Sequence, residues 1–557
     1  MTARDRAVLY LVAAAVTALV LAPLAAPGYA LRYDMVFVPR QPLSWDLVAP
    51  TYSLPRAVPM DAVISLVTQF LPGWLVQRLA LAGVIFMSAV GAGRVVPTRR
   101  QAIRLIAAVG YAWTPYLAER LLIGQWGLLV AYAALPWIVR AALLARSGRP
   151  GALPRLVLAA APAAITPTGG LLALATVAVL FTARARWRVA AMTVGAVVAL
   201  NTPWMFAAWF SAAGGSSDPA GVAAFAARAE NWSGPLGALA GTGGIWSAQA
   251  TPASRSAAVI PLVTLGALAL GGVGFSRLRD RLPRGTAARL TLLAGGCLVL
   301  SSLGVLPGVE AGLRWLVESV PGAGLLRDGQ KFLAPYALVL VMCGALGVER
   351  LVTRWPTVAA SLLVGAALLP IAVMPDLACG GAGRLRPVSY PADWDQVAAR
   401  VAGDPGEVLS LPLSAYRAYS WNSGQVVLDP LPRYLAADVL ADDTLYVGDV
   451  LVNGENPRFR EVRRLLSEGR PVTATGVRWV VVQHHTLGEL DPSWLAGLRM
   501  VHEGPSLTLY LNPTVPADSG PPSFGFERWV MAVMLSFYVL GFIFAAIWVL
   551  RRPATAW

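Results

Sequence analysis

The chain has 557 residues, of which 56% are hydrophobic and only 13% are charged, and its mean hydropathy is +0.60. A soluble domain carries roughly a quarter charged residues, so the composition excludes an ordinary soluble protein and indicates a membrane protein. The formal net charge of +15 does not indicate nucleic-acid binding, because the arginines fall in short clusters between apolar runs.

Apolar runs long enough to cross a hydrocarbon layer about 30 Å thick recur along the chain. The first run follows Arg4 and Arg6 and is long for a signal peptide, so we interpret it as a retained span. The fifth and sixth runs are short, and "AITPTGG" between them predicts either a tight hairpin or one broken helix inside the bundle. The twelve predicted spans are 7–26, 73–93, 103–119, 127–145, 155–166, 169–182, 189–209, 257–276, 289–306, 332–349, 356–374 and 526–550.

Arginine clusters between the runs predict how the chain is oriented in the membrane. With the N-terminus in the cytoplasm, every cluster falls on the cytoplasmic side, and so does the C-terminus. The segments 27–72, 120–126, 210–256, 307–331 and 375–525 then lie outside. The clusters are Arg94, Arg99, Arg100 and Arg104; Arg140, Arg146, Arg149 and Arg155; Arg184, Arg186 and Arg188; Arg277, Arg279, Arg281 and Arg284; Arg350 and Arg354; and Arg551 and Arg552.

The longest outer segment is predicted to fold as an extracytoplasmic α/β domain. It covers 375–525, after a membrane bundle of residues 1–374 and before a last helix with a short cytoplasmic tail, 526–557. Helical periodicity is present in "PADWDQVAARVA" and "RFREVRRLLSEG". Short apolar strands bounded by glycine or proline are predicted at "GEVLSLPL", "GVRWVVVQ" and "LTLYLNP".

Acidic residues at the outer membrane boundary are candidates for function, because a charge at that depth is costly unless it is paired or solvated. Asp34 follows the first span closely and could take a proton from an attacking hydroxyl, the general-base role of an inverting sugar transfer. Glu119 is a second candidate catalytic residue, with an ordinary interfacial role at a helix end as its alternative.

The single lysine of the chain, Lys331, lies in "GLLRDGQKFLAPY" at the outer start of the tenth span. A lipid phosphate at that depth needs fixed cations, and arginine and lysine supply them as a planar fork and a point charge. We therefore predict a donor phosphate site at Arg327, Lys331 and Arg32. The alternative is a plain boundary at which basic side chains reach the head groups. Residues predicted to contact the acceptor or the sugar are Asp46, Gln125, Trp126 and Asp328.

Three stretches carry a family resemblance: "APG" followed by Asp34 and a proline-rich stretch, "GQW" at the start of an apolar span, and "LLRDGQKF". They resemble the multi-spanning GT-C glycosyltransferases, in particular the actinobacterial arabinofuranosyltransferases of the large D type. The resemblance covers the membrane part of the chain. It implies a polyprenyl-phosphate-linked sugar donor, an envelope glycan or glycolipid acceptor on the outer face, Asp34 as the catalytic acid residue, and the lipid phosphate at Arg327 and Lys331.

The chain also departs from that family. Met35 follows Asp34, where the relatives have a small hydroxyl residue and then a lysine. The outer loop has no DD or DxD pair, so the use of a divalent ion such as Mg, Mn or Ca stays open, as do the sugar and the acceptor. Two other functions remain open. A transporter or flippase of lipid-linked sugars predicts ionisable residues near the midplane and inverted repeats. A non-catalytic envelope-assembly scaffold needs no outer acid.

Overall fold

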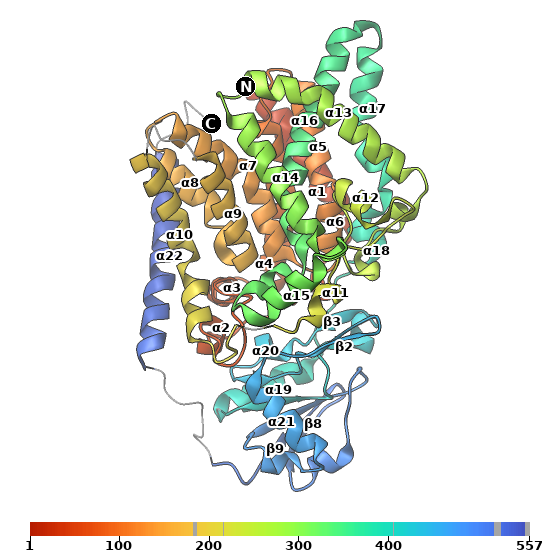
Figure 1. The fold of residues 1–557 in the computed structure, drawn as a ribbon. Helices are drawn as coiled ribbons and strands as arrows, with labels where there is room; N and C mark the ends of the chain where they lie inside the picture. The colour runs from red at the N-terminus through yellow and green to blue at the C-terminus, as the bar shows by residue number, and fades with distance from the viewer. Residues whose placement is uncertain (182–186, 216, 405, 517–524, 552–557) are drawn as a thin grey trace.

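In a computed structural model the chain forms a helical bundle with a small sheet domain at one end (Figure 1). The structure describes residues 1–181, 187–215, 217–404, 406–516 and 525–551. The predicted inner arginines Arg184, Arg186 and Arg552 lie outside these residues. Among the described residues, nine helices are long and apolar enough to cross a membrane, where the sequence predicts twelve spans.

The nine helices differ in how much of their surface the protein covers. Most side chains of α7 and α16 are buried at the centre of the bundle, whereas α17 has no buried residue. An apolar helix with so little of its surface covered suits a lipid environment. The helices, four of them extended by an adjoining 3-10 turn, are α1 (Ala3–Leu21), α4 (Gly73–Val95), α7 (Trp126–Arg146), α10 (Trp187–Phe210), α13 (Ile260–Arg281), α14 (Thr286–Ser302), α16 (Ala334–Arg354), α17 (Ala359–Val373) and α22 (Gly525–Arg551).

Three predicted spans are shorter helices in the structure. The predicted span 103–119 is divided into α5 (Gln101–Ala112) and α6 (Pro115–Leu122), because Pro115 cannot continue a helix but suits a first turn. The predicted spans 155–166 and 169–182 correspond to α8 (Ala152–Ala160) and α9 (Pro167–Leu180), which pack against α7. The predicted break between them is confirmed, and Thr166 caps α9 by accepting a hydrogen bond from the Gly169 N–H at 3.3 Å.

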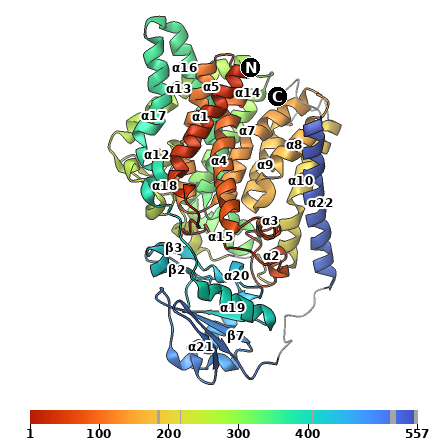
Figure 2. The same cartoon turned by 180° about the vertical axis from the view of Figure 1, so that it is seen from behind.

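Arginines at the helix ends lie at the end of the bundle where α1 begins. Arg140 Nη1 donates to the carbonyl of Arg94 at 2.9 Å, and Gln101 Nε2 donates to the carbonyl of Asp5 in α1 at 2.8 Å. Helix α22 ends at the same end of the bundle, and the sheet domain lies at the opposite end (Figure 2). The start of α1, the end of α22 and the sheet domain have the relative positions that the positive-inside pattern predicts, and the side of the membrane on which each lies stays a prediction.

The sheet domain has one mixed sheet in the order β4 (Val439–Leu440), β1 (Val408–Leu411), β7 (Trp479–Gln483), β9 (Leu507–Leu511) and β8 (Arg499–Glu503). The first three strands are parallel, and β9 runs antiparallel to both of its neighbours. Alternate residues of β7 pack against α19 (Ala392–Gly403) on one face and α21 (Pro457–Ser467) on the other. The two helices and three strands that the sequence predicts in this domain are confirmed as α19, α21, β1, β7 and β9.

A hairpin of β2 (Tyr416–Ala418) and β3 (Val426–Leu428) joins this domain to the bundle (Figure 1). Tyr33, in the loop after α1, pairs with β3: its N–H donates to the Val426 carbonyl at 2.7 Å, and its carbonyl accepts from the Leu428 N–H at 2.9 Å. Arg417 of β2 is fully buried, and its Nη2 lies 2.9 Å from the carboxylate of Asp429, the residue after β3. This ion pair stabilises the hairpin. The first outer loop, which carries Tyr33, therefore pairs with the edge of the sheet-domain hairpin.

Candidate functional site

The loop that carries Asp34 rests on the turn between α6 and α7. The Asp34 N–H donates to the Ile123 carbonyl at 3.1 Å, and the Met35 N–H donates to the Arg32 carbonyl at 2.9 Å. Gly124 in that turn has a φ of +84°, and a Cβ there would lie 2.3 Å from the Met35 nitrogen. Only glycine allows both the left-handed backbone and this approach. The "GQW" stretch therefore fixes the backbone of Asp34.

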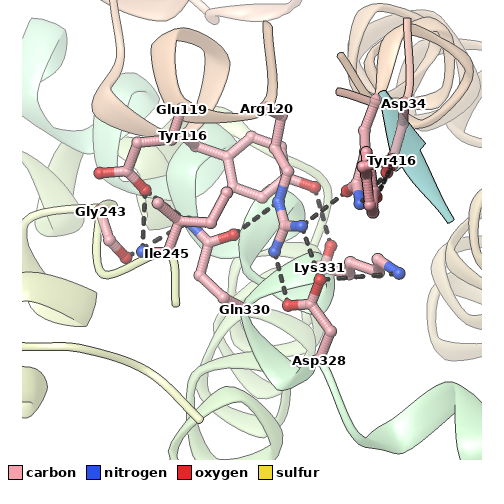
Figure 3. Close-up of polar contacts among 11 residues, drawn as sticks. Asp34, Tyr116, Glu119, Arg120, Gly243, Ile245, Asp328, Gln330, Lys331 and Tyr416 are labelled. Carbon is pink, nitrogen blue, oxygen red and sulfur yellow. Dashed lines mark hydrogen bonds and ion pairs between the residues drawn. The ribbon is translucent and has the colours of Figure 1, made fainter. Parts of the chain in front are cut away.

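The Asp34 carboxylate is half-buried and held by two donors from different parts of the chain (Figure 3). Tyr416 OH donates to Oδ1 at 2.7 Å, and Gln125 Nε2 donates to Oδ2 at 3.0 Å. Burial and the neighbouring Asp34 charge raise the pKa of Tyr416 well above its usual value, so the phenol keeps the proton that it donates. An ionised carboxylate has about four acceptor positions, so two remain for a substrate hydroxyl.

Gln125 is itself oriented by a buried ion pair. Its Oε1 accepts from Arg120 Nη1 at 2.6 Å, which leaves its Nε2 directed at Asp34. Arg120 binds Asp328 through two parallel hydrogen bonds of 2.7 Å, and its side chain is fully buried. This planar, two-pronged geometry is among the strongest that a carboxylate makes with a protein cation. Burial alone would raise the pKa of Asp328, but Arg120 and Lys331 hold it below its usual value.

Lys331 lies at the other end of the same network. Its Nζ is 3.6 Å from Asp328 Oδ2, and 29% of its side chain is exposed. Its backbone carbonyl accepts from Tyr116 OH at 2.8 Å, which fixes the 3-10 turn that precedes α16. A continuous polar network therefore runs from Tyr416 through Asp34, Gln125, Arg120 and Asp328 to Lys331 (Figure 3).

Arg327 lies outside this network and has a partner in the sheet domain. Its Nη2 is 3.1 Å from Glu455 Oε1, while Arg56 pairs with the second oxygen of Glu455. Ser217 Oγ donates to the same carboxylate at 2.7 Å. Arg56 therefore shares an acidic partner with Arg327, and its charge also acts on Lys331. Arg56 is a residue that the sequence analysis missed, since nothing distinguishes it from a solvated loop arginine.

Arg32, predicted to bind the donor phosphate, directs its guanidinium elsewhere. Its Nε donates to the Leu122 carbonyl at 2.9 Å, Nη1 to Gln425 Oε1 at 2.6 Å, and Nη2 to the Gln249 carbonyl at 3.1 Å. These contacts tie the first outer loop to α6, to the outer loop before α13 and to the sheet-domain hairpin. They bring Arg32 neither to Lys331 nor to Arg327.

Glu119 is fully buried on the far side of Arg120 from Asp34 (Figure 3). Its Oε2 accepts from the Ile245 N–H at 3.1 Å and from Gln330 Nε2 at 3.1 Å. Gln330 in turn accepts from Arg120 Nε at 2.7 Å, so Glu119 supports the buried ion pair. A general base must contact its substrate, and the catalytic role of Glu119 stays a prediction.

Two further predicted residues lie apart from the network. Trp126 is 6% exposed and packs against Phe37, with 5.0 Å between ring centroids, so its faces are covered by the bundle. Asp46 lies farther along the first outer loop, where burial and the neighbouring Asp438 raise its pKa to about 7. Their contacts with an acceptor or a sugar stay predictions.

The residues around Asp34 offer few ligands for a divalent ion. In the part of the chain that the structure describes, no three His, Cys, Asp or Glu side chains are grouped to hold a metal. The second carboxylate of the network, Asp328, is occupied by Arg120 and Lys331. Divalent ions such as Mg²⁺ and Ca²⁺ need several oxygen ligands. We therefore assign no metal ligand here.

The similarity of this chain to known proteins is found in its fold and not in its sequence. No protein-family model matches it, and no curated protein matches it. Among solved structures, its fold is similar to that of a mutant form of arabinofuranosyltransferase AftD from mycobacteria, with a TM-score of 0.53 and 17% sequence identity. The match covers 93% of this chain but 42% of the AftD chain, so this chain spans less than half of that protein's length. At this identity the similarity shows a shared fold, and not a shared family or activity.

Proposed function

We propose that the protein is a membrane glycosyltransferase. It transfers a sugar from a polyprenyl-phosphate-linked donor to a glycan or lipid acceptor of the cell envelope, on the outer face. The observation that carries the proposal is the held carboxylate of Asp34, which Tyr416 and Gln125 orient and which the Arg120–Asp328 pair connects to a partly exposed cation. The fold similarity to a protein named as an arabinofuranosyltransferase supports the same reaction class.

In this proposal Asp34 is the general base of an inverting transfer. The acceptor oxygen attacks the anomeric carbon of the donor sugar while its proton passes to the Asp34 carboxylate. A new carbon–oxygen bond forms as the bond to the phosphate oxygen breaks, and that electron pair leaves with the polyprenyl phosphate. Tyr416 and Gln125 keep the carboxylate in one orientation, which spares the reorganisation that a mobile side chain would require.

The leaving phosphate gains negative charge in this step and needs nearby cations. Lys331 is partly exposed in the 3-10 turn before α16, and the charge of Arg56 acts on it. Arg327 lies four residues before Lys331 and shares Glu455 with Arg56. Preorganised positive charge at a developing oxyanion lowers the barrier because it is already in place when the reaction occurs. Glu455 holds the two arginines together until a phosphate competes for them.

The donor site can be tested with the double substitution Lys331→Ala and Arg327→Ala. We expect donor affinity to fall by about 10- to 100-fold per lost contact, since a hydrogen bond to a charged group contributes about 1.5–3 kcal/mol. Acceptor affinity should change little. Binding of a polyprenyl phosphate to the full-length protein in detergent measures the effect. The charge-matched control is Arg314→Ala with Arg464→Ala, which removes two exposed arginines from surface ion pairs. A double mutant that binds donor as wild type does would remove these cations from the donor site.

The role of Tyr416 can be tested by replacing it with phenylalanine. The ring is retained, but Asp34 loses one of the two hydrogen bonds that orient its carboxylate. A less fixed base should lower kcat by about 10-fold, as expected for the loss of one hydrogen bond to a charged group, with little change in the KM for the donor. Tyr446→Phe, at an exposed tyrosine of the same domain, is the control. An unchanged kcat would contradict a positioning role for Tyr416.

The reaction itself is tested with the full-length protein in proteoliposomes. Polyprenyl-phosphate-linked sugars and an envelope glycan fraction are supplied outside, and new glycosidic product is measured. A transporter of lipid-linked sugars would move the donor across the bilayer without forming product, and an assembly scaffold would do neither. Product formation that depends on the protein is the expected result, and its absence with every donor would overturn the proposal.

A further inference from the structure

Three arginines from two distant segments line one small hollow at the junction of the bundle and the sheet domain. Arg32 comes from the first outer loop, and Arg384 and Arg386 follow α18 (Ala378–Gly383). The turn between β2 and β3 closes the hollow with Asn422 and Gln425. Neither Asp34 nor the cations proposed to bind the donor line it. The hollow is therefore separate from the proposed catalytic site.

These three arginines, two of them half-buried and Arg386 exposed, form no ion pair with an acidic residue among those that the structure describes. Among the described residues, the guanidinium groups of Arg32, Arg384 and Arg386 donate hydrogen bonds only to neutral carbonyl and amide oxygens, and Arg32 also lies over the Tyr33 ring at 5.0 Å from its centroid. By contrast, the fully buried Arg120 and Arg417 each pair with an aspartate. Gathering three positive charges in a partly desolvated place is costly unless an anion compensates them.

Donor groups remain available around the hollow. Arg386 uses its Nε for the Gly383 carbonyl at 2.6 Å, and Arg384 uses its Nη1 for the carbonyls of Gln249 and Thr251. Arg386 is exposed and Arg384 is half-buried, so the rest of both planar forks can reach an incoming group. A guanidinium fork matches two oxygens of one phosphate.

The size and the place of the hollow restrict what can bind. Its volume is about 10 Å³, close to the room that one water-sized group needs, so an anion would insert one oxygen and keep the others at the surface. Helix α18 packs against α1 and the 3-10 turn that follows α1, at the outer end of that span. The hollow thus lies close to the depth of outer lipid head groups.

We propose that Arg32, Arg384 and Arg386 form a second anion site, which binds a phosphate group at the outer membrane boundary. A bound phosphate would bridge the first outer loop, the segment after α18 and the sheet-domain hairpin. It would thereby compensate the three charges and strengthen the junction of the two domains. The phosphate can come from a lipid head group or from a soluble phosphate, and the two sources offer the same oxygens to the same forks.

The test uses the full-length protein and the double substitution Arg384→Gln and Arg386→Gln. Inorganic phosphate is titrated into detergent-solubilised protein by calorimetry, and phosphatidylglycerol retained from mixed micelles is counted by native mass spectrometry. We expect the variant to lose at least about 10-fold in affinity for one of the probes, as expected for removing a charge-assisted hydrogen bond. The charge-matched control is Arg470→Gln with Arg499→Gln, two exposed arginines of the sheet domain.

Each outcome either tests the anion site or identifies the source of its phosphate. A loss confined to inorganic phosphate assigns the site to a soluble phosphate, and a loss confined to phosphatidylglycerol assigns it to a head group; both support the site. If wild type, variant and control bind each probe with the same affinity, or if the wild type binds neither probe, the proposal is overturned. The single change Arg386→Gln, at an exposed side chain whose one contact is to a nearby backbone carbonyl, repeats the test with little risk to the fold.

Discussion

Replacing Asp34 by asparagine is expected to reduce sugar transfer by about 10²–10⁴-fold, the usual contribution of a general base. The asparagine oxygen can still accept from Tyr416, and the side chain keeps its size. Its amide nitrogen, however, would face the donor Nε2 of Gln125, whose orientation Arg120 fixes. The change therefore removes the base and adds one local mismatch at a half-buried position, without emptying any core space.

The activity loss must be separated from a loss of structure. Membrane insertion should match the wild type, and the midpoint of thermal unfolding in detergent should fall by no more than a few degrees, while product formation in proteoliposomes falls by about 10²–10⁴-fold. Asp376→Asn is the control, because the Asp376 carboxylate is also held by hydrogen bonds, from the N–H of Ser254 at 2.9 Å and from the Ser254 hydroxyl, but lies outside the Asp34 network. Full activity in the Asp34 variant would remove the catalytic assignment and favour a scaffold or transporter, neither of which needs this acid.

Sequence patterns predict much of the fold because hydropathy and strand periodicity are local properties. The helix at 392–403 and the strand at 479–483 are examples, each bounded by proline or glycine and each apolar on the faces that are buried. The predicted span 103–119 is wrong as one helix. Its hydropathy is continuous, and only the capping of α6 by Thr114 before Pro115 distinguishes two helices there. Hydropathy also cannot separate a lipid-facing helix from one that the protein covers, which is why the short α8 and α9 were predicted as spans.

The candidate site also contains residues that the sequence indicates and residues that only the fold brings there. Gln125, Asp328 and Lys331 stand out in the sequence as polar residues beside apolar runs, and the structure connects all three with Asp34. Tyr416 does not stand out, because its contact depends on a hairpin of the sheet domain pairing with Tyr33. Such tertiary pairings leave no local signal.

Charge and position near the predicted outer boundary group Arg32 and Arg327 with Lys331 in the sequence. In the structure each guanidinium has its own partners: Arg327 pairs with Glu455 of the sheet domain, and Arg32 donates to carbonyl and amide oxygens. The number of basic residues near an outer boundary is visible in a sequence, whereas their partners come from segments far along the chain. Donor and anion sites therefore need the fold before residues can be assigned to them.

Removing Arg120 should have the largest effect on stability. Arg120→Met keeps most of the side-chain volume but leaves the buried Asp328 with only the 3.6 Å contact to Lys331. Breaking one partner of a buried ion pair costs about 3–5 kcal/mol, because the remaining charge is desolvated and uncompensated. Gln125 and Gln330 lose a donor as well, so the orientation of Asp34 is expected to relax and transfer to fall with stability.

The double variant Arg120→Met with Asp328→Leu separates the charge from the packing. Because Arg120 and Lys331 hold the pKa of Asp328 below its usual value, the pair stabilises the protein above the unfolded pKa, and this contribution is lost as the pH falls through the folded value. At neutral pH the single variant should therefore unfold at lower temperature than the double variant, in which no unpaired carboxylate remains. Arg314→Met, at an exposed pair with Glu310, should change the free energy of unfolding by less than about 1 kcal/mol. If the single and double variants unfold at the same temperature, the unpaired carboxylate is not the cause of the loss, and Arg120 acts through its contacts with the two glutamines instead.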